Sequence, residues 1–171
     1  FYSKEKMEIT KLVIDDNPKS AISEALRSIR TNIEFMLPDI KKKVISITST
    51  VSGEGKTFIA VNLGAILAYS KIKVVVVDLD MRKPKVHLAF GLEKGTKGVS
   101  TILINRNTVE ESITQTGVDN LHFISASPTP PNPSELILSD NFKKFTEKLK
   151  ENYDVVIFDT PPVGLVTDGI L

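Results

Sequence analysis

The sequence predicts an α/β fold: a doubly wound, mostly parallel sheet with helices on both faces. Residues 73–78 (KVVVVD) and 154–159 (DVVIFD) are apolar almost throughout. A strand with one face in water alternates apolar and polar residues, so we expect these two strands to be buried on both faces. Further strands are expected at 44–48 and 121–124, with helical periodicity between them. Such alternation is typical of doubly wound folds with right-handed crossovers.

The first expected helix starts at Pro18 and carries an apolar stripe that should face a core. The stripe consists of Ile22, Ala25, Leu26, Ile29, Ile33 and Met36. Glu24, Arg27 and Arg30 flank it at a spacing of three and form a charged ridge. From periodicity alone, a solvated helix face with one weak Glu–Arg pair explains this ridge. Residues 1–17 should form an N-terminal arm with a short strand at 12–14.

The remaining helices lie further along the chain. One begins near Lys56, and two short ones are expected at 98–105 and 109–113. The four prolines of segment 125–136 keep it out of a sheet interior. Asn132 or Ser134 can cap the amphipathic helix that follows, which should end near Asn152.

The amino-acid composition limits the classes of protein to which this chain can belong. The 171 residues suit one domain with a sizeable core. The net charge of +1 gives no support to nucleic-acid binding. The chain has no cysteine, which excludes disulfides and thiolate metal sites. No apolar run reaches the roughly 18 residues that a membrane-spanning helix needs.

A phosphate-binding loop is predicted where the strand at 44–48 meets the helix near Lys56. Gly53 and Gly55 let the backbone approach an anion, Lys56 can reach the β- and γ-phosphates, and the Thr57 hydroxyl is placed for Mg²⁺. The complete P-loop pattern has glycine where this chain has Thr50, so the match is to the looser form. We expect the nucleotide to contact the whole run, namely Ser52, Gly53, Glu54, Gly55, Lys56, Thr57 and Phe58.

Three acids follow the buried strands. Asp78 and Asp80 end the strand at 73–78, and Asp159 ends the strand at 154–159. Ligands of open α/β sheets bind outside the carboxyl ends of the strands, so these acids should share an edge with the P-loop. Asp159 should hold Mg²⁺, and Asp78 or Asp80 should do metal or base work.

Several segments together resemble the bacterial tyrosine kinases that govern capsule and exopolysaccharide synthesis. They are SEALRSIRTNIEF, STVSGEGKT, VVVVDLDMRKP, KGVSTIL, SPTPPNPSELI and YDVVIFDTPPVGLVTD, and the resemblance covers residues 18 to 170 without a large gap. The charged ridge and the PPNPSEL segment are the discriminating pieces, because related P-loop ATPases share the rest.

The resemblance implies an ATP-dependent, autophosphorylating protein-tyrosine kinase. Lys56, Asp78, Asp80 and Asp159 would be its catalytic residues, and Mg²⁺ would be held by Thr57, Asp78 and Asp159 directly or through water. Phosphoryl transfer then depends on positioning and charge neutralisation, with ATP or ADP bound. Glu24, Arg27 and Arg30 would form the subunit interface of a ring-like oligomer. A membrane-embedded polysaccharide co-polymerase would be the partner, and it would hold the cytoplasmic kinase at the inner face of the membrane.

The sequence also departs from the family. Ser52 stands where the family usually has proline, and the family's further strand and terminal tyrosine cluster have no counterpart here. Tyr2, Tyr69 and Tyr153 are dispersed, the last two in core-like contexts. We therefore expect an arm at 1–17 and a P-loop kinase domain at 18–171 that lacks its carboxyl-terminal part.

Two other functions stay open at this point. One is a partitioning or septum-positioning ATPase switch of the same fold. Those proteins carry a signature lysine where this chain has Val51, which argues against a switch. The other is a non-catalytic interaction module.

Overall fold

The structure is a computed structural model that describes residues 12–13, 19–36, 42–93 and 95–162. The arm expected at 1–17 lies outside the described residues except for Leu12 and Val13, neither of which joins the sheet. The segment 163–171 also lies outside them.

Five strands form one sheet in the order β1-β5-β2-β4-β3. β1, β5, β2 and β4 are parallel, and β3 joins β4 in the antiparallel sense. The strands are β1 (Lys43–Ile47), β2 (Val74–Asp78), β3 (Ile113–Gln115), β4 (Leu121–Ile124) and β5 (Val155–Asp159). The predicted fold and its four parallel strands are confirmed, and only the ends of three strands shift by one residue.

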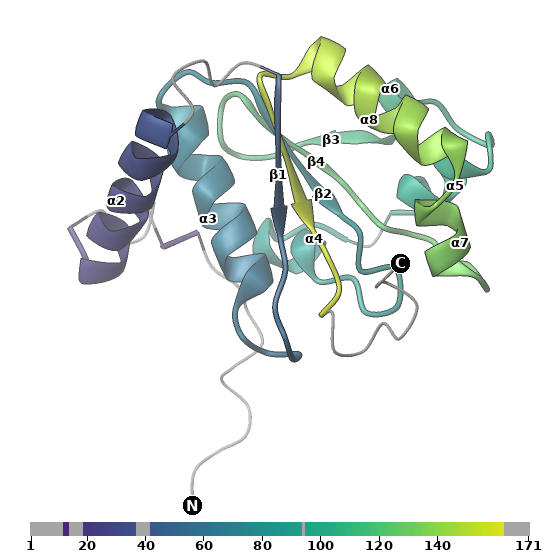
Figure 1. The fold of residues 1–171 in the computed structure, drawn as a ribbon, viewed down its shortest axis with the longest axis horizontal. Helices are drawn as coiled ribbons and strands as arrows, with labels where there is room; N and C mark the ends of the chain where they lie inside the picture. The colour runs from purple at the N-terminus through teal and green to yellow at the C-terminus, as the bar shows by residue number, and fades with distance from the viewer. Residues whose placement is uncertain (1–11, 14–18, 37–41, 94, 163–171) are drawn as a thin grey trace, which may run out of the picture.

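Helices cover both faces of the sheet (Figure 1). α3 and α4 pack on one face with α2 outside α3, and α5, α6, α7 and α8 lie on the other side. The helices are α2 (Ala21–Met36), α3 (Lys56–Tyr69), α4 (Val86–Ala89), α5 (Val99–Leu103), α6 (Val109–Ser112), α7 (Pro133–Ile137) and α8 (Asp140–Asn152). All parallel strands therefore end at the same edge, where α3 begins.

The valines of β2 divide the core into two layers. Val74 and Val76 join the cluster under α3, Val75 and Val77 join the cluster under α8, and all four are fully buried. The expectation that this strand is covered on both faces is confirmed.

One predicted helix is a residue shorter because a strand was missed, and another prediction was wrong. The helix expected at 109–113 ends at Ser112, because Ile113 is extended (φ −73°, ψ 128°) and starts the edge strand β3. The single helix after the proline-rich segment is in fact α7 and α8. Ser139 separates them with extended geometry, and its hydroxyl accepts the N–H of Phe142 at 3.3 Å as the cap of α8.

The apolar stripe of α2 is also less buried than expected. Leu26 is buried, but Ile22 is 50%, Ile29 37% and Met36 75% exposed. α2 packs mainly on the helix α3, and the buried residues on its inner side are Ser23 and Leu26. Much of the apolar stripe of α2 is therefore exposed on the surface of this chain.

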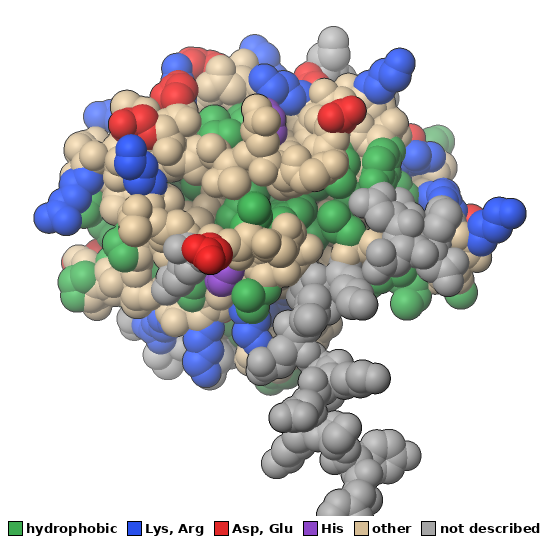
Figure 2. Space-filling model, turned by 180° about the vertical axis from the view of Figure 1, so that it is seen from behind, with side chains coloured by type: hydrophobic (Ala, Val, Ile, Leu, Met, Phe, Trp, Pro, Cys, Tyr) green, Lys and Arg blue, Asp and Glu red, His purple; other side chains and the backbone are tan. Residues whose placement is uncertain are grey.

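The face seen from behind carries charges of both signs around its margin, with neither sign forming a continuous field (Figure 2). This agrees with the near-neutral net charge. Within the described residues, no helix combines the length and the apolar character that crossing a membrane requires.

Gly64 provides the first test, because it lets α3 lie directly on the sheet. A Cβ at this position would come within 2.9 Å of Val76 Cγ2 and 3.1 Å of Leu121 Cδ1. Overpacking a tight core costs about 1–3 kcal/mol. We expect Gly64→Val to lower the free energy of unfolding by about 2 kcal/mol in urea titrations followed by circular dichroism. Gly117→Val, whose side chain would meet open space, is the control. Equal stability of both variants would contradict this packing.

Candidate nucleotide site

The loop between β1 and α3 has the backbone that the P-loop prediction requires. Gly53 and Gly55 have φ of 91° and 90°, a region that favours glycine, and a Cβ on either would meet no atom within 4 Å. Gly55 is also the N-cap of α3, so the first amides of a 14-residue helix open onto the same space. An anion can therefore approach the backbone without meeting a side chain.

Glu54 braces the start of the loop, where Thr50 stands in place of glycine. Its Oε2 accepts the N–H groups of Thr50 at 2.9 Å and of Val51 at 3.3 Å, which closes the loop on itself. Glu54 stays a predicted nucleotide contact, although its side chain bonds the loop backbone and does not line the cleft.

The cleft lies at the carboxyl edge of the sheet. It is lined by the P-loop, the loop after β2 and the end of β5, namely Ser52, Gly53, Gly55, Lys56, Thr57, Phe58, Asp80, Lys83, Lys85, Asp159 and Thr160. Most residues predicted from the sequence therefore meet here.

Thr57 and Asp159 join the first turn of α3 to the end of β5. The Thr57 hydroxyl donates to Asp159 Oδ2 at 2.6 Å. Asp159 is 3% exposed, and its Oδ1 is buried with no hydrogen-bond partner among the described residues. A buried carboxylate oxygen without a partner, beside a hydroxyl, suits a cation.

The donor set fits Mg²⁺ better than a metal held by protein ligands alone. Within the described residues, no cluster of three or more His, Asp or Glu side chains could hold a metal ion. Mg²⁺ usually takes one or two carboxylates and completes its shell with phosphate oxygens and water. Thr57 and Asp159 are the residues that would hold it in this way.

Asp78 and Asp80 occupy different places. Asp80 lines the cleft. Asp78 is fully buried and does not line it. Its Oδ1 accepts the N–H of Asp80 at 3.0 Å, and its Oδ2 accepts the N–H groups of Lys85 at 3.1 Å and Val86 at 3.2 Å. Asp78 thus fixes the loop that carries Asp80.

The two buried acids bind protons unusually tightly. Burial, together with the Asp159 charge, raises the pKa of Asp78 to about 8, although backbone N–H groups oppose the shift. Burial likewise raises the pKa of Asp159 to about 6, while the Thr57 hydroxyl and the Lys56 charge pull it down. Without a cation, the ionised site is therefore costly.

The charged ridge does not lie free on α2. Arg27 Nη1 contacts Glu24 Oε1 at 2.6 Å, and Arg30 Nε lies 3.5 Å from Glu34 Oε1. Arg30 Nη1 also donates to Ser70 Oγ at 3.1 Å, just after the end of α3. Arg30 therefore has a role within the subunit that periodicity could not reveal.

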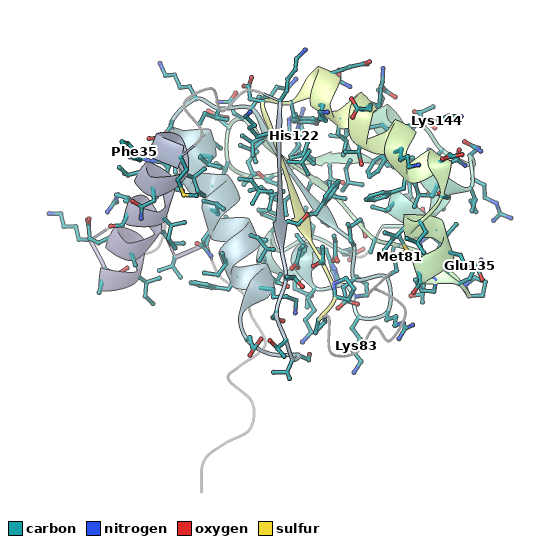
Figure 3. The ribbon with its side chains drawn as sticks, viewed as in Figure 1. Phe35, Met81, Lys83, His122, Glu135 and Lys144 are labelled. Atoms are coloured by element: carbon teal, nitrogen blue, oxygen red, sulfur yellow. The ribbon has the colours of Figure 1, made fainter. Side chains whose placement is uncertain are left out.

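The tyrosines differ in exposure. Tyr153 is buried, and its hydroxyl lies 2.7 Å from His122 Nδ1. Burial raises the pKa of Tyr153 to about 12. Figure 3 places His122 toward the opposite end of the sheet from Lys83, so this pair is remote from the cleft. Tyr69 was expected in a core-like context but is 50% exposed.

Sequence reasoning missed three cleft residues: Lys83, Lys85 and Thr160. Thr160 also donates through Oγ1 to Ile47 O at 2.9 Å. Lys83 and Lys85 follow the strand that ends in Asp78, and Thr160 follows the strand that ends in Asp159. This position after the strand ends is the sequence feature that could have identified them.

Comparisons with known proteins decide the family. A family model described as an AAA domain matches residues 42–171. The putative tyrosine-protein kinase CapB of Staphylococcus aureus is 42% identical over 167 residues, which cover 98% of this chain and 73% of the relative. The chain belongs to the bacterial tyrosine-protein kinase family. A solved structure of the chimerical protein CapA2B2 matches this kinase domain with a TM-score of 0.85 and 45% identity, covering 92% of this chain and 69% of that one.

The switch ATPases are more distant from this kinase domain. The septum site-determining protein MinD of Pyrococcus horikoshii, complexed with Mg-ADP, has a TM-score of 0.60 and 25% identity. The match covers 70% of this chain and 49% of the MinD chain. This neighbour of the same fold was solved with Mg-ADP bound, which supports nucleotide binding in general, while the closer likeness of this chain is to kinases.

Asp159 in this kinase domain allows a test of the buried charge. Its pKa is raised from 3.8 to about 6, so the folded state keeps the proton more tightly than the unfolded state. The protonated Asp159 side chain therefore contributes its full stabilisation of the folded state below the unfolded pKa of 3.8. This stabilisation is lost as the pH rises through about 6. At pH 7.5 the ionised carboxylate costs about 2–3 kcal/mol, since each pKa unit is worth about 1.4 kcal/mol.

We therefore expect Asp159→Asn to raise the melting temperature of the nucleotide-free protein by about 5–10 °C at pH 7.5 in the presence of a chelator, with the difference shrinking toward pH 4.5. Thermal scans at both pH values measure it. Asp119→Asn, at an exposed acid, should change little. A less stable Asp159→Asn protein would show that the carboxylate stabilises the fold.

Proposed function

We propose that this domain transfers the γ-phosphoryl group of ATP to tyrosine. The observation that supports it best is the Thr57–Asp159 pair next to an open P-loop, with a buried Asp159 oxygen that has no partner in the described part of the chain. Family membership supplies the reaction class, because the relative CapB is named a putative tyrosine-protein kinase. Bound Mg²⁺ would neutralise phosphate charge during transfer.

The cleft supports distinct roles for its residues. Lys56 and the amides from Gly53 onward would hold the phosphates, and Thr57 with Asp159 would hold Mg²⁺. Ser52 and Phe58 line the cleft and complete the nucleotide contacts. Asp78 was expected to help hold the metal directly or through water, and a role through water would suit it better, because both its oxygens accept backbone N–H groups.

Asp80 is the better placed of the two candidate bases. An acceptor tyrosine has an ordinary pKa of about 10, so a nearby carboxylate aids its alignment or deprotonation. Asp80 lines the cleft, whereas Asp78 is fully buried. Asp78 then acts as a positioning residue for the loop that presents Asp80.

The wider biological role follows from the family resemblance. We propose a cytoplasmic kinase domain at 18–171 that follows an arm at 1–17, assembles into ring-like oligomers through Glu24, Arg27 and Arg30, and phosphorylates tyrosines in a neighbouring subunit. A membrane-embedded polysaccharide co-polymerase would recruit it to the inner face of the membrane during capsule or exopolysaccharide synthesis.

Labelled ATP tests the chemistry. We expect the full-length protein to incorporate phosphate on tyrosine, as shown by phosphoamino-acid analysis. Lys56→Met should abolish both transfer and MgADP binding in calorimetry, because the lysine holds the phosphates. Asp80→Asn should reduce transfer at least 100-fold while keeping MgADP affinity, in line with loss of a general base (roughly 10²–10⁴-fold).

Lys144→Met, at an exposed lysine on α8, is the control for these variants. Label confined to free phosphate would favour an ATPase switch. Label on serine would remove the tyrosine-kinase assignment. An Asp80→Asn enzyme of normal rate would move the base to Asp78.

The ridge can be tested without disturbing Arg30. The Glu24–Arg27 pair is exposed at its glutamate end, where the side chain is 68% accessible, so losing it should cost the monomer about 1 kcal/mol or less. We expect a Glu24→Ala/Arg27→Ala double variant of the full-length protein to lose its higher oligomers in light scattering, with a melting temperature within about 3 °C of wild type.

The matched control removes another exposed pair of the same spacing, Asp140 and Lys143 on α8. It should assemble normally. If the ridge variant also forms the wild-type oligomer, the ridge is a solvated helix face.

A further inference from the structure

Thr160 ties the strand that ends in Asp159 to the strand that enters the P-loop. Its N–H donates to the carbonyl oxygen of Ile47 at 3.1 Å, and its hydroxyl donates to the same oxygen at 2.9 Å. Ile47 is the last residue of β1 and directly precedes the P-loop. β1 and β5 run side by side toward the same edge (Figure 1). One residue thus makes two bonds at the point where the P-loop leaves the sheet.

The two residues after Thr160 add no backbone donor to this tie. Pro161 and Pro162 have no N–H group. A carbonyl oxygen has two lone pairs, and the two Thr160 donors can use both of them at Ile47. Threonine is β-branched, so its side chain has few rotamers, and the bond to Ile47 selects one. The hydroxyl of Thr160 therefore fixes the last peptide group of β1 against the end of β5.

Asp159 is held from its other side as well. Its carbonyl oxygen accepts the N–H of Leu79, just beyond the end of β2, at 2.9 Å. Its Oδ2 accepts the Thr57 hydroxyl at 2.6 Å. Thr160 lies between Asp159 and the strand of the P-loop, is half-buried and lines the same cleft. The position of Asp159 relative to the P-loop thus depends on Thr160.

A magnesium–nucleotide complex and a free nucleotide make different demands on this position. Mg²⁺ requires nearly ideal octahedral geometry with ligands at about 2.1 Å, so it would respond to a small displacement of Asp159 relative to the bound phosphates. The P-loop amides and Lys56 belong to the loop and the helix after it, and they can hold phosphates without Asp159. The tie through Thr160 therefore matters most when the metal is present.

We propose that Thr160 is a positioning residue of the magnesium site. Its hydroxyl sets the place of Asp159 relative to the P-loop, and so determines how strongly Mg²⁺ increases the affinity for nucleotide. This inference rests on the proposed magnesium site at Thr57 and Asp159. It does not depend on the transfer of phosphate to tyrosine.

Calorimetry of ADP binding to the full-length protein, with Mg²⁺ and with a chelator, tests the proposal. We expect Thr160→Val to bind ADP about three- to tenfold more weakly with Mg²⁺, a factor typical of one lost hydrogen bond. With the chelator the affinity should change less than twofold. Thr160→Ser keeps the hydroxyl and should restore the effect of Mg²⁺. The melting temperature of Thr160→Val should stay within about 5 °C of wild type, since its N–H still donates to Ile47.

Thr146→Val on α8 is the matched control, because Thr146 is also half-buried and its hydroxyl donates to the carbonyl oxygen of Phe142 at 3.0 Å. It should bind ADP as wild type does under both conditions. Equal weakening of Thr160→Val with and without Mg²⁺, or weakening in neither condition, overturns the proposal. So does a Thr160→Ser protein that behaves like the valine variant, or a Thr160→Val protein that does not fold.

The wild-type protein separates this inference from the proposals on which it rests. If Mg²⁺ does not strengthen ADP binding to the wild type, the magnesium site is wrong and the role of Thr160 is wrong with it. Because ADP binding requires no transfer, a protein that never places label on tyrosine would overturn the kinase function alone.

Discussion

Two carboxylates buried side by side are the constraint on which this site depends. Asp78 and Asp159 are register partners on neighbouring parallel strands and are 0% and 3% exposed. Burial of adjacent like charges is unfavourable unless each is compensated. Backbone N–H groups surround Asp78, whereas the Asp159 carboxylate accepts from one hydroxyl and, as far as the described residues show, its other oxygen has no partner. Mg²⁺ bound beside the nucleotide would supply positive charge next to Asp159.

The rest of the fold holds these two acids against the P-loop. Every residue of α3 from Ala60 to Ala68 is buried, and Gly64 brings the helix directly onto β2 and β4. The first turn of α3 therefore has little freedom relative to the sheet. Thr57 can then meet Asp159 at hydrogen-bond distance although the two lie 102 positions apart in the chain.

The structure was predicted most accurately from the sequence at positions where the residue type permits only one kind of local structure. The valines of β2 and the glycines of the P-loop belong to this class, because their burial and backbone angles follow from chemistry alone. Contacts between distant segments could not be predicted. Periodicity located the stripe of α2 but not its partner, so Ile29 and Met36 were expected to be covered. The three-residue edge strand β3 is too short for its alternation to be recognised.

The P-loop helix also links the nucleotide site to α2. Its first turn carries Lys56 and Thr57, and Ser70 just beyond its last turn accepts a hydrogen bond from Arg30. In the middle of the helix, the buried Asn62 accepts the N–H of Val13 at 3.0 Å. α2 and the first turn of α3, which carries Lys56 and Thr57, therefore belong to one packed unit with α3 at its centre. An oligomer contact at the ridge would therefore act on the same helix as the nucleotide.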